Sequence, residues 1–256
     1  MSSCLYFGKT NKEVIYPAAA IGVSHDVQTN TQRFFGGVEK DKNAAKYLDN
    51  FPVHQDDISC IGIAGGELRN IVVTGEVGKM STVHVWDSVT MKSIAQFSLG
   101  DKAMGVKAVG ISPCQRYVAA VDASNDHHMF IFNVQKKEQQ LKVASGADVV
   151  YNIQWSKKPN DLRFAALSTR NIQFWHPADA SKRLIKKGTF GQKFESTVFN
   201  ALAFDEDGVC YSAGQNGGIY VWDQKTDLGL VLKAHAGDVT GIACNQGTLV
   251  SSGKDD

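Results

Sequence analysis

Few residues of this 256-residue chain have the types and the spacing that catalytic or binding chemistry requires. Gly8, Lys9 and Thr10 match the end of a phosphate-binding loop, in which a lysine and a hydroxyl group follow a glycine. Ser3 occupies the place of that loop's first glycine, and no strand is expected before it. The sequence therefore predicts no nucleotide site.

A group of acidic and imidazole side chains could in principle hold a metal ion: Asp122, Asp126, His127 and His128. Asp, Ser and Asn are also ordinary residues of a turn between two strands, which explains the group without an ion. Elsewhere no serine, cysteine or pair of carboxylates has the setting of a nucleophile or an acid–base couple. We therefore expect no enzyme activity, no cofactor, no metal and no small-molecule substrate.

Other histidines have the spacing of a structural hydrogen-bond series inside a β-sheet. In such a series a His before the first strand, a Ser or Thr in the second, an Asp in the next turn and a Trp bond to one another. The residues that fit are His54, Thr74 and Trp86 in one segment, and His235, Ser252 and Asp255 in another. Buried polar groups are normally satisfied in this way, so we predict a structural role for them.

The elements that must position these residues are repeated along the chain. Val83–Asp87 ends in Trp-Asp and returns as Gly218–Asp223, with weaker copies at Met129–Asn133 and Asn171–His176. The repeat therefore places Trp86, Asp87, Trp175, Trp222 and Asp223 at equivalent structural positions. A period of about 45 residues ending in Trp-Asp is typical of a WD40 β-propeller, with one four-stranded blade per repeat.

We therefore predict an all-β, WD40-type propeller with four full blades and two partial ones, forming an incomplete ring that is part of a larger propeller protein. Residues 1–13 form an N-terminal segment, and the propeller covers 14–256 with an insertion at 36–53. Val14–Val27 and Thr31–Phe35 are expected as two strands of one partial blade. The other begins at His235.

Composition indicates an ordinary globular protein. Apolar residues make up 43% of the chain and charged residues 21%, and the net charge of +1 favours neither nucleic acid nor membrane as a partner. Five scattered cysteines without a Cys-x-x-Cys pair are typical of reduced thiols in the cytoplasm. No secretory signal is visible, and the longest apolar stretch, Ala18–Val23, is too short to cross a bilayer.

Several stretches in order resemble the echinoderm microtubule-associated protein-like family. The matching stretches are Val27–Arg33, His54–Ile58, Val85–Thr90, Val121–His127, Lys187–Gly191 and Gly247–Asp255. The resemblance implies the first propeller of a tandem pair, in a cytoskeletal protein of the cytoplasm that associates with microtubules, for some members in cilia or axonemes.

The function expected from this resemblance is a non-enzymatic scaffold that binds tubulin, microtubules or a microtubule-associated assembly. The alternative is a general WD40 adaptor, such as a scaffold for a ubiquitin ligase or a signalling complex, without tubulin contact. Neither alternative requires nucleic acid or a membrane.

The insertion at 36–53 departs from the family pattern. Ala44, Tyr47, Leu48 and Phe51 have helical spacing within it, which predicts a short amphipathic helix. One interpretation is that this helix docks into a neighbouring protein, and the other is that it packs on its own blade.

Charge placement suggests a partner surface. In a propeller, the turns that join strands one–two and three–four lie on one face. Basic residues in or near those turns are Lys92, Lys136, Lys137, Lys157, Lys158, Lys182, Arg183 and Lys225. Acidic residues expected on the opposite face are Asp56, Asp57, Asp122, Asp126, Asp148 and Asp238. A basic face suits the acidic surface of tubulin, although lysine is also common in exposed turns of any protein.

Overall fold

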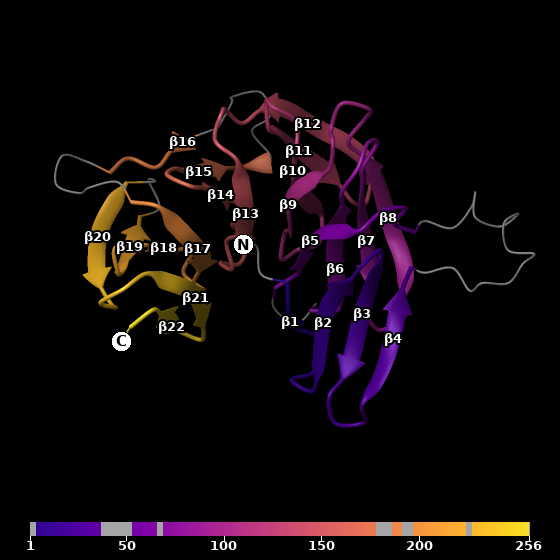
Figure 1. The fold of residues 1–256 in the computed structure, drawn as a ribbon, viewed down its shortest axis with the longest axis horizontal. Coiled ribbons are helices and arrows are strands. Elements are labelled where there is room, and N and C mark those ends of the chain that lie inside the picture. The colour runs from indigo at the N-terminus through magenta and orange to yellow at the C-terminus, as the bar shows by residue number, and fades with distance from the viewer. Residues whose placement is uncertain are drawn as a thin grey trace, which may run out of the picture. The chain divides into compact units, whose positions relative to one another are not determined.

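The computed structural model describes residues 4–36, 53–65, 69–177, 186–190, 197–223 and 227–255. These residues contain strands and turns but no α-helix (Figure 1). The chain divides into two compact units, Ser3–Val143 and Ala144–Asp256 with Met1–Ser2, which we call the N-terminal and C-terminal units. Each unit is described by itself.

The N-terminal unit contains three four-stranded antiparallel sheets, each of which follows chain order. The first holds β1 (Tyr6–Phe7), β2 (Glu13–Ala18), β3 (Ile21–Asp26) and β4 (Thr31–Phe35). The second holds β5 (Ile58–Ile63), β6 (Ile71–Glu76), β7 (Thr82–Asp87) and β8 (Lys92–Ser98). The third holds β9 (Val106–Ile111), β10 (Tyr117–Asp122), β11 (His128–Asn133) and β12 (Glu138–Ala144).

The C-terminal unit repeats this arrangement in two four-stranded sheets and one two-stranded sheet. The strands are β13 (Val150–Trp155), β14 (Phe164–Ser168), β15 (Ile172–Trp175), β16 (Lys186–Lys187), β17 (Phe199–Phe204), β18 (Cys210–Gly214), β19 (Gly218–Trp222), β20 (Leu228–Lys233), β21 (Val239–Asn245) and β22 (Thr248–Gly253). The prediction of an all-β chain with one sheet per repeat is confirmed.

The first sheet is fuller than the sequence indicated. The stretch expected as one strand, Val14–Val27, folds as β2 and β3, because Ala19 takes a φ of 51° and reverses the chain. Tyr6 and Phe7, in the segment assigned outside the propeller, pair with Ile15 and Val14 as β1. The described residues therefore contain five four-stranded sheets, whereas the sequence predicted four full blades.

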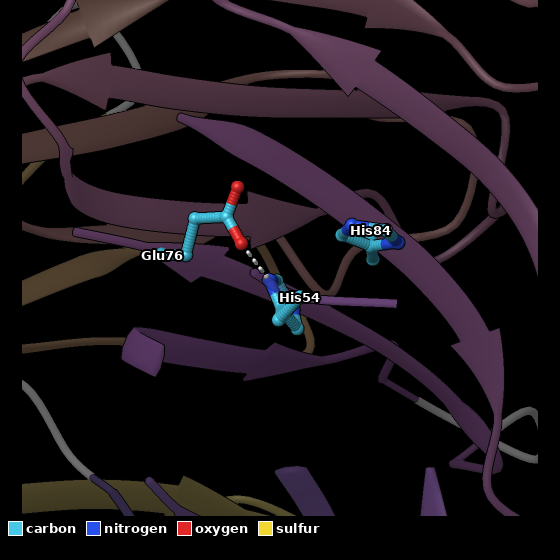
Figure 2. A group of neighbouring side chains, drawn as sticks. All are labelled: His54, Glu76 and His84. Atoms are coloured by element: carbon cyan, nitrogen blue, oxygen red, sulfur yellow. Dashed lines mark hydrogen bonds and ion pairs between the residues drawn. The ribbon is translucent and has the colours of Figure 1, made fainter. Parts of the chain in front are cut away.

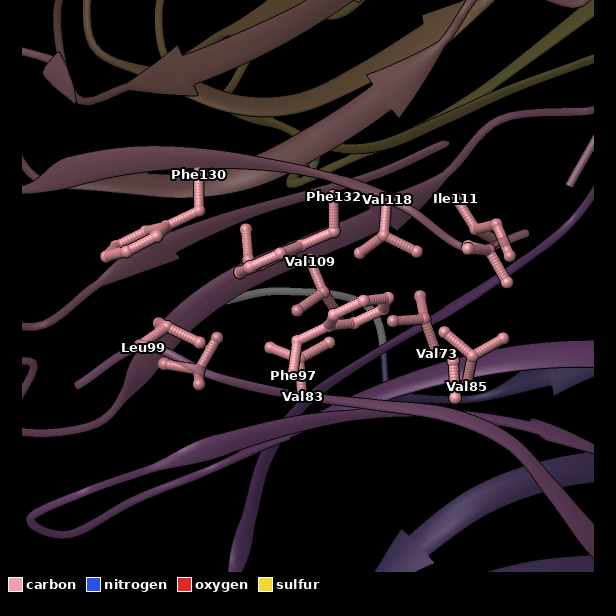
Figure 3. Packing of buried hydrophobic residues seen from close by; sticks show 14 of the residues in the cluster. Val73, Val83, Val85, Phe97, Leu99, Val109, Ile111, Val118, Phe130 and Phe132 are labelled. Atoms are coloured by element: carbon pink, nitrogen blue, oxygen red, sulfur yellow. The ribbon is translucent and has the colours of Figure 1, made fainter. Parts of the chain in front are cut away.

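The core of the N-terminal unit lies between the sheets. Between the second and third, Val73, Val85, Val118 and the stacked rings of Phe97 and Phe132 are buried, with ring centroids 4.5 Å apart (Figure 3). Burial of each such side chain contributes about 1.5–3 kcal/mol. These side chains alternate with those of the opposite sheet face, as the period of a strand requires.

The repeated tryptophan anchors one sheet to the next. Trp86 is fully buried and stacks on Phe35 of β4, with ring centroids 4.7 Å apart. Its indole lies against Gly22 of β3, where an added Cβ would lie only 2.5 Å from a ring carbon. Trp222 has the same relation to Gly188 in the C-terminal unit. A glycine in the preceding sheet therefore makes room for each tryptophan.

Candidate functional site

A buried polar network lies beneath one end of the second sheet. Nδ1 of His54 donates to Oε2 of Glu76 at 2.9 Å (Figure 2). Nε2 of His54 lies 2.6 Å from the hydroxyl of Thr74, which donates to it. The indole N–H of Trp86 donates to the same Thr74 oxygen at 3.2 Å. The structure thus brings together the three residues that the sequence grouped and adds Glu76.

Glu76 joins two loops through this network. Its Oε1 accepts from the backbone N–H and the hydroxyl of Thr82, at 2.8 and 2.6 Å, and its Oε2 accepts from Gln55 N–H at 2.9 Å. Burial alone would raise the pKa of Glu76, but hydrogen bonds from His54, Thr82 and Gln55 lower it to about 2. The carboxylate is therefore ionised and acts only as an acceptor.

His84 of β7 stands beside this network, its ring centroid 4.2 Å from that of His54. Because the Thr82 hydroxyl already donates to Glu76, Nε2 of His84 must donate to Thr82 Oγ1, 2.9 Å away. Nδ1 of His84 then keeps a buried lone pair with no hydrogen-bond partner in the described residues. Burial, together with His54, lowers the pKa of His84 to about 3, so the ring is neutral.

The same three residues have ligand types that could hold a metal ion. Ligand atoms of His54, Glu76 and His84 all lie within 4.8 Å of one another. However, both nitrogens of His54 and both carboxylate oxygens of Glu76 already have hydrogen-bond partners, and an ion would have to displace some of them. The geometry therefore favours a structural hydrogen-bond network over a metal site.

Sequence reasoning missed Glu76 because the series was expected to use an Asp in the following turn. Glu76 is the last residue of β6 and lies two positions after Thr74, so both side chains point to the same face of the strand. That spacing, with a buried His in the preceding loop, was the available indication.

The C-terminal unit contains a related series in its two-stranded sheet. Nδ1 of His235 lies 2.5 Å from a carboxylate oxygen of Asp255, and Nε2 lies 2.8 Å from the hydroxyl of Ser251. The prediction that Ser252 fills this place is wrong: Ser252 contacts Thr240 instead, at 3.1 Å. Because neighbouring side chains of a strand point to opposite faces, a shift of one residue changes the partner completely.

This difference gives a matched pair of variants. We expect Ser251→Ala to lower the free energy of unfolding by about 1 kcal/mol, because it removes the partner of His235 Nε2. Ser252→Ala, at an exposed position, should change it by less than about 0.5 kcal/mol. Chemical denaturation measures both, and an equal or larger loss for Ser252→Ala would contradict the assignment.

The remaining Trp-Asp positions are not equivalent. Trp222 donates its indole N–H to Ser212 Oγ at 2.8 Å, whereas that of Trp175 is buried and has no partner in the described residues. Asp87 and Asp223 cap turns: Asp87 Oδ1 accepts from Val89 N–H at 2.7 Å, and Asp223 Oδ1 from Asp227 N–H at 2.9 Å. Trp86 and Trp222 thus both donate to a hydroxyl group of the second strand of their sheet, and Trp175 does not.

The group around Asp122 is a turn. Asp122 Oδ1 accepts from His128 N–H at 2.8 Å and from the hydroxyl of Ser124 at 2.7 Å. Asp122 is only 1% exposed, so the prediction that it contributes to an acidic surface is wrong. The carboxylate of Asp122 therefore accepts hydrogen bonds within the turn and adds no charge to the surface of the unit.

Basic side chains gather at one end of the N-terminal unit. Two links join corresponding ends of the three sheets: Ile58 N–H donates to Ala19 O at 2.8 Å, and Val77 forms a bridge with Gly105. The turns between strands two and three therefore lie at the same end of the unit. At the opposite end lie all turns between strands one–two and three–four. These turns and their flanks hold Lys9, Lys12, Arg69, Lys92, Arg116, Lys136 and Lys137, which we call the basic turn face.

The acidic residues at that end are already engaged. Asp26 and Asp87 accept backbone N–H groups of their own turns, and Glu138 forms an exposed ion pair with Lys136, with N and O 3.6 Å apart. The turn between β11 and β12 is capped in the same way, because Asn133 Oδ1 accepts from Lys136 N–H at 2.9 Å. Glu13, next to Lys12, is the fourth described carboxylate at this end, and seven basic residues against four acidic ones leave the face net positive.

Two of the equivalent turns of the C-terminal unit have the opposite character. The described turns after β17 and β19 carry Asp205, Glu206, Asp207, Asp223 and Asp227. Lys157 donates to the carbonyl of Cys244 and is held within its own unit, next to exposed Lys158. The turn after β13 therefore keeps positive charge at Lys157 and Lys158, beside the acidic turns after β17 and β19. Lys182, Arg183, Lys225, Ala44, Tyr47, Leu48 and Phe51 lie outside the described residues.

Comparison with known proteins agrees with the sequence pattern. Residues 50–256 match the family described as "Echinoderm microtubule-associated protein first beta-propeller". The chain is similar to the ciliary WD repeat-containing protein ctxp80 of Euplotoides octocarinatus, with 32% identity over 99% of this chain and 35% of the relative. It is also similar to the 77 kDa echinoderm microtubule-associated protein of Strongylocentrotus purpuratus, with 28% identity over 95% of this chain and 34% of the relative.

The human echinoderm microtubule-associated protein-like 1 is 26% identical over 95% of this chain and 29% of its own length. The chain therefore spans about a third of the length of the curated relatives it matches. Among solved structures, the computationally designed Ika8 protein is similar with a TM-score of 0.67 and 19% identity, covering 100% of this chain and 70% of that one, which shows the fold alone. Within the described residues, no helix has the length and apolar character to span a membrane.

Proposed function

Because the chain belongs to the echinoderm microtubule-associated protein family, whose first propeller it matches, we propose that it is a non-enzymatic cytoskeletal scaffold that binds tubulin or microtubules. A microtubule-associated assembly in a cilium or axoneme is the proposed setting, since the relative ctxp80 is described as ciliary. The basic turn face carries this proposal, because it places seven basic residues in the turns at one end of the described N-terminal unit.

The proposed mechanism is multipoint electrostatic contact by turns that are ordered before binding. The caps at Asp26, Asp87 and Asn133 fix the three turns between third and fourth strands. Arg33 donates to Val89 O at 2.6 Å and joins β4 to the turn after β7. Little side-chain and loop entropy then has to be lost on binding, apart from that of the lysine side chains themselves.

Charge reversal on this face is the direct test. Lys136→Glu/Lys137→Glu should weaken microtubule co-sedimentation by about tenfold at low salt, because two charges on an exposed turn change sign from positive to negative. The control is Lys79→Glu/Lys102→Glu, which makes the same charge change at the other end of the same unit. Equal losses for both variants, with both folded, would contradict a specific basic turn face.

The competing proposal is a general WD40 adaptor for a ubiquitin ligase or signalling complex. It predicts that the folded chain does not pellet with microtubules at any salt concentration. It also predicts that the two charge-reversal variants behave alike.

A further inference from the structure

Three apolar side chains are exposed at the end of the N-terminal unit opposite the basic turn face. Met80 is 66% exposed, Met104 62% and Val77 39%. Val77 and Met80 belong to the turn between β6 and β7, and Met104 lies between β8 and β9. Single exposed apolar residues are normal, but a group on adjoining loops is typical of an interaction site. We call these three residues the methionine patch.

The two loops are in direct contact. Val77 forms an antiparallel bridge with Gly105, the residue after Met104. An added Cβ on Gly105 would lie 3.4 Å from Val77 Cα and 3.6 Å from the backbone nitrogen of Gly78. The methionine patch is therefore carried by two loops, of the second and third sheets, that meet at the Val77–Gly105 bridge, although 24–27 positions separate Met104 from the other two residues.

Hydrogen bonds hold the two loops that carry the methionine patch in place. Glu76 accepts N–H groups from Thr82, after the first loop, and from Gln55, in the segment beside it. Val77 N–H donates to Asp57 O at 2.9 Å, and Ala123 N–H donates to Gly105 O at 2.9 Å. A partner would thus meet a preformed surface, which lowers the entropy cost of binding.

The backbone at both methionines has the left-handed conformation that other turn residues of this chain, such as Lys137 and Gln246, also adopt. Met80 and Met104 have φ values of 58° and 57°, in the left-handed region where glycine or asparagine is less strained. Met91 also has a positive φ, but it packs against the core around Trp86 and Phe35. Met80 and Met104 have no such packing, and an exposed, adaptable apolar side chain is typical of a binding surface.

The charge around the methionine patch is net negative. Asp56, Asp57, Asp101 and Asp126 lie at this end of the unit, against Lys79, Lys102 and Lys107. The carboxylate of Asp56 reaches the turn itself, since an added Cβ on Gly78 would lie 2.7 Å from its Oδ2. An apolar surface beside carboxylates matches a partner that combines apolar and basic side chains.

We propose that the methionine patch is a docking surface for a cationic peptide segment that presents an apolar side chain to Met80 and Met104. The basic side chains of the segment would face Asp56 and its neighbouring carboxylates. This surface lies at the opposite end of the unit from the basic turn face, so the proposal and the microtubule contact can fail independently.

The test uses the whole chain with its methionine methyl groups labelled with carbon-13. The chain has five methionines, and Met129, which is fully buried, and Met91 serve as internal controls. The probe is a short synthetic peptide that alternates lysine and leucine, and the comparison peptides replace lysine with glutamate or leucine with serine. We expect the Met80 and Met104 signals to shift with the lysine–leucine peptide alone.

A variant then assigns the surface. Met80→Ser/Met104→Ser should raise the Kd of the lysine–leucine peptide by about tenfold or more, because two apolar contacts are lost. Leu230→Ser/Val250→Ser, at positions 50% and 61% exposed in the C-terminal unit, should leave it unchanged. The proposal is overturned by equal shifts with the glutamate–leucine peptide, by no shift at millimolar peptide, or by shifts on raising the protein concentration alone, which would assign the surface to a second copy.

Discussion

Replacing Glu76 with alanine is expected to lower the free energy of unfolding of the N-terminal unit by about 3–5 kcal/mol. The substitution leaves the N–H groups of His54, Gln55 and Thr82 without their acceptor. The His54 N–H cannot recover a hydrogen bond to water, since the His54 side chain is fully buried. Thermal melting and hydrogen exchange across Ile71–Asp87 would measure the loss.

The control for this variant is Glu138→Ala. Glu138 also faces a basic side chain, but it is 52% exposed and its ion pair with Lys136 is long. An exposed pair of this kind contributes about 0–1 kcal/mol, so the melting temperature should hardly change. Similar losses for the two glutamates would mean that the buried network does not stabilise the sheet.

Acidification is expected to destabilise the N-terminal unit in a way that depends on His84. Its pKa is lowered to about 3 in the folded state, from an ordinary value near 6.5, so the unfolded chain binds the proton first as pH falls. The stability due to the neutral ring is therefore complete above about pH 6.5 and is lost progressively toward pH 3. Between pH 7.5 and 4.5 the expected loss is about 2–3 kcal/mol. Glu76, with its pKa lowered to about 2, adds a loss in the same direction below about pH 4.5.

His84→Phe tests this assignment because phenylalanine keeps a ring in place and cannot take up a proton. Its melting temperature should fall much less than that of the parent chain between pH 7.5 and 4.5. His25→Phe is the control, since His25 is partly exposed and contacts Asn30. If His84→Phe retains the full pH dependence, then another group is responsible for it.

The features that follow a strong local pattern were predictable from the sequence. Trp86 and Trp222 identified the repeat, and the family indicated by the resemblance is confirmed by the match over residues 50–256. Strand alternation around these tryptophans is regular, so the sheets could be placed from their apolar residues. The N-terminal strand β1 was missed because Tyr6–Phe7 is only two residues long and its pairing with β2 is not a local property.

The candidate site was predictable only in part, because it depends on register and on contacts between distant residues. One position separates Ser251 from Ser252, and the sequence does not say which of them faces His235. Glu76 takes the place of an expected aspartate, and nothing local distinguishes its buried carboxylate from an exposed one. The methionine patch joins two loops through the Val77–Gly105 bridge, which no periodicity reveals.

Microtubule co-sedimentation of the purified, folded chain across a salt series tests the central claim most directly. The account predicts pelleting at low salt that weakens as the Debye length falls below about 8–10 Å, and that requires Lys136 and Lys137. A folded chain that stays in the supernatant at every salt concentration would contradict the proposed contact through the basic turn face, and the adaptor proposal would then take its place.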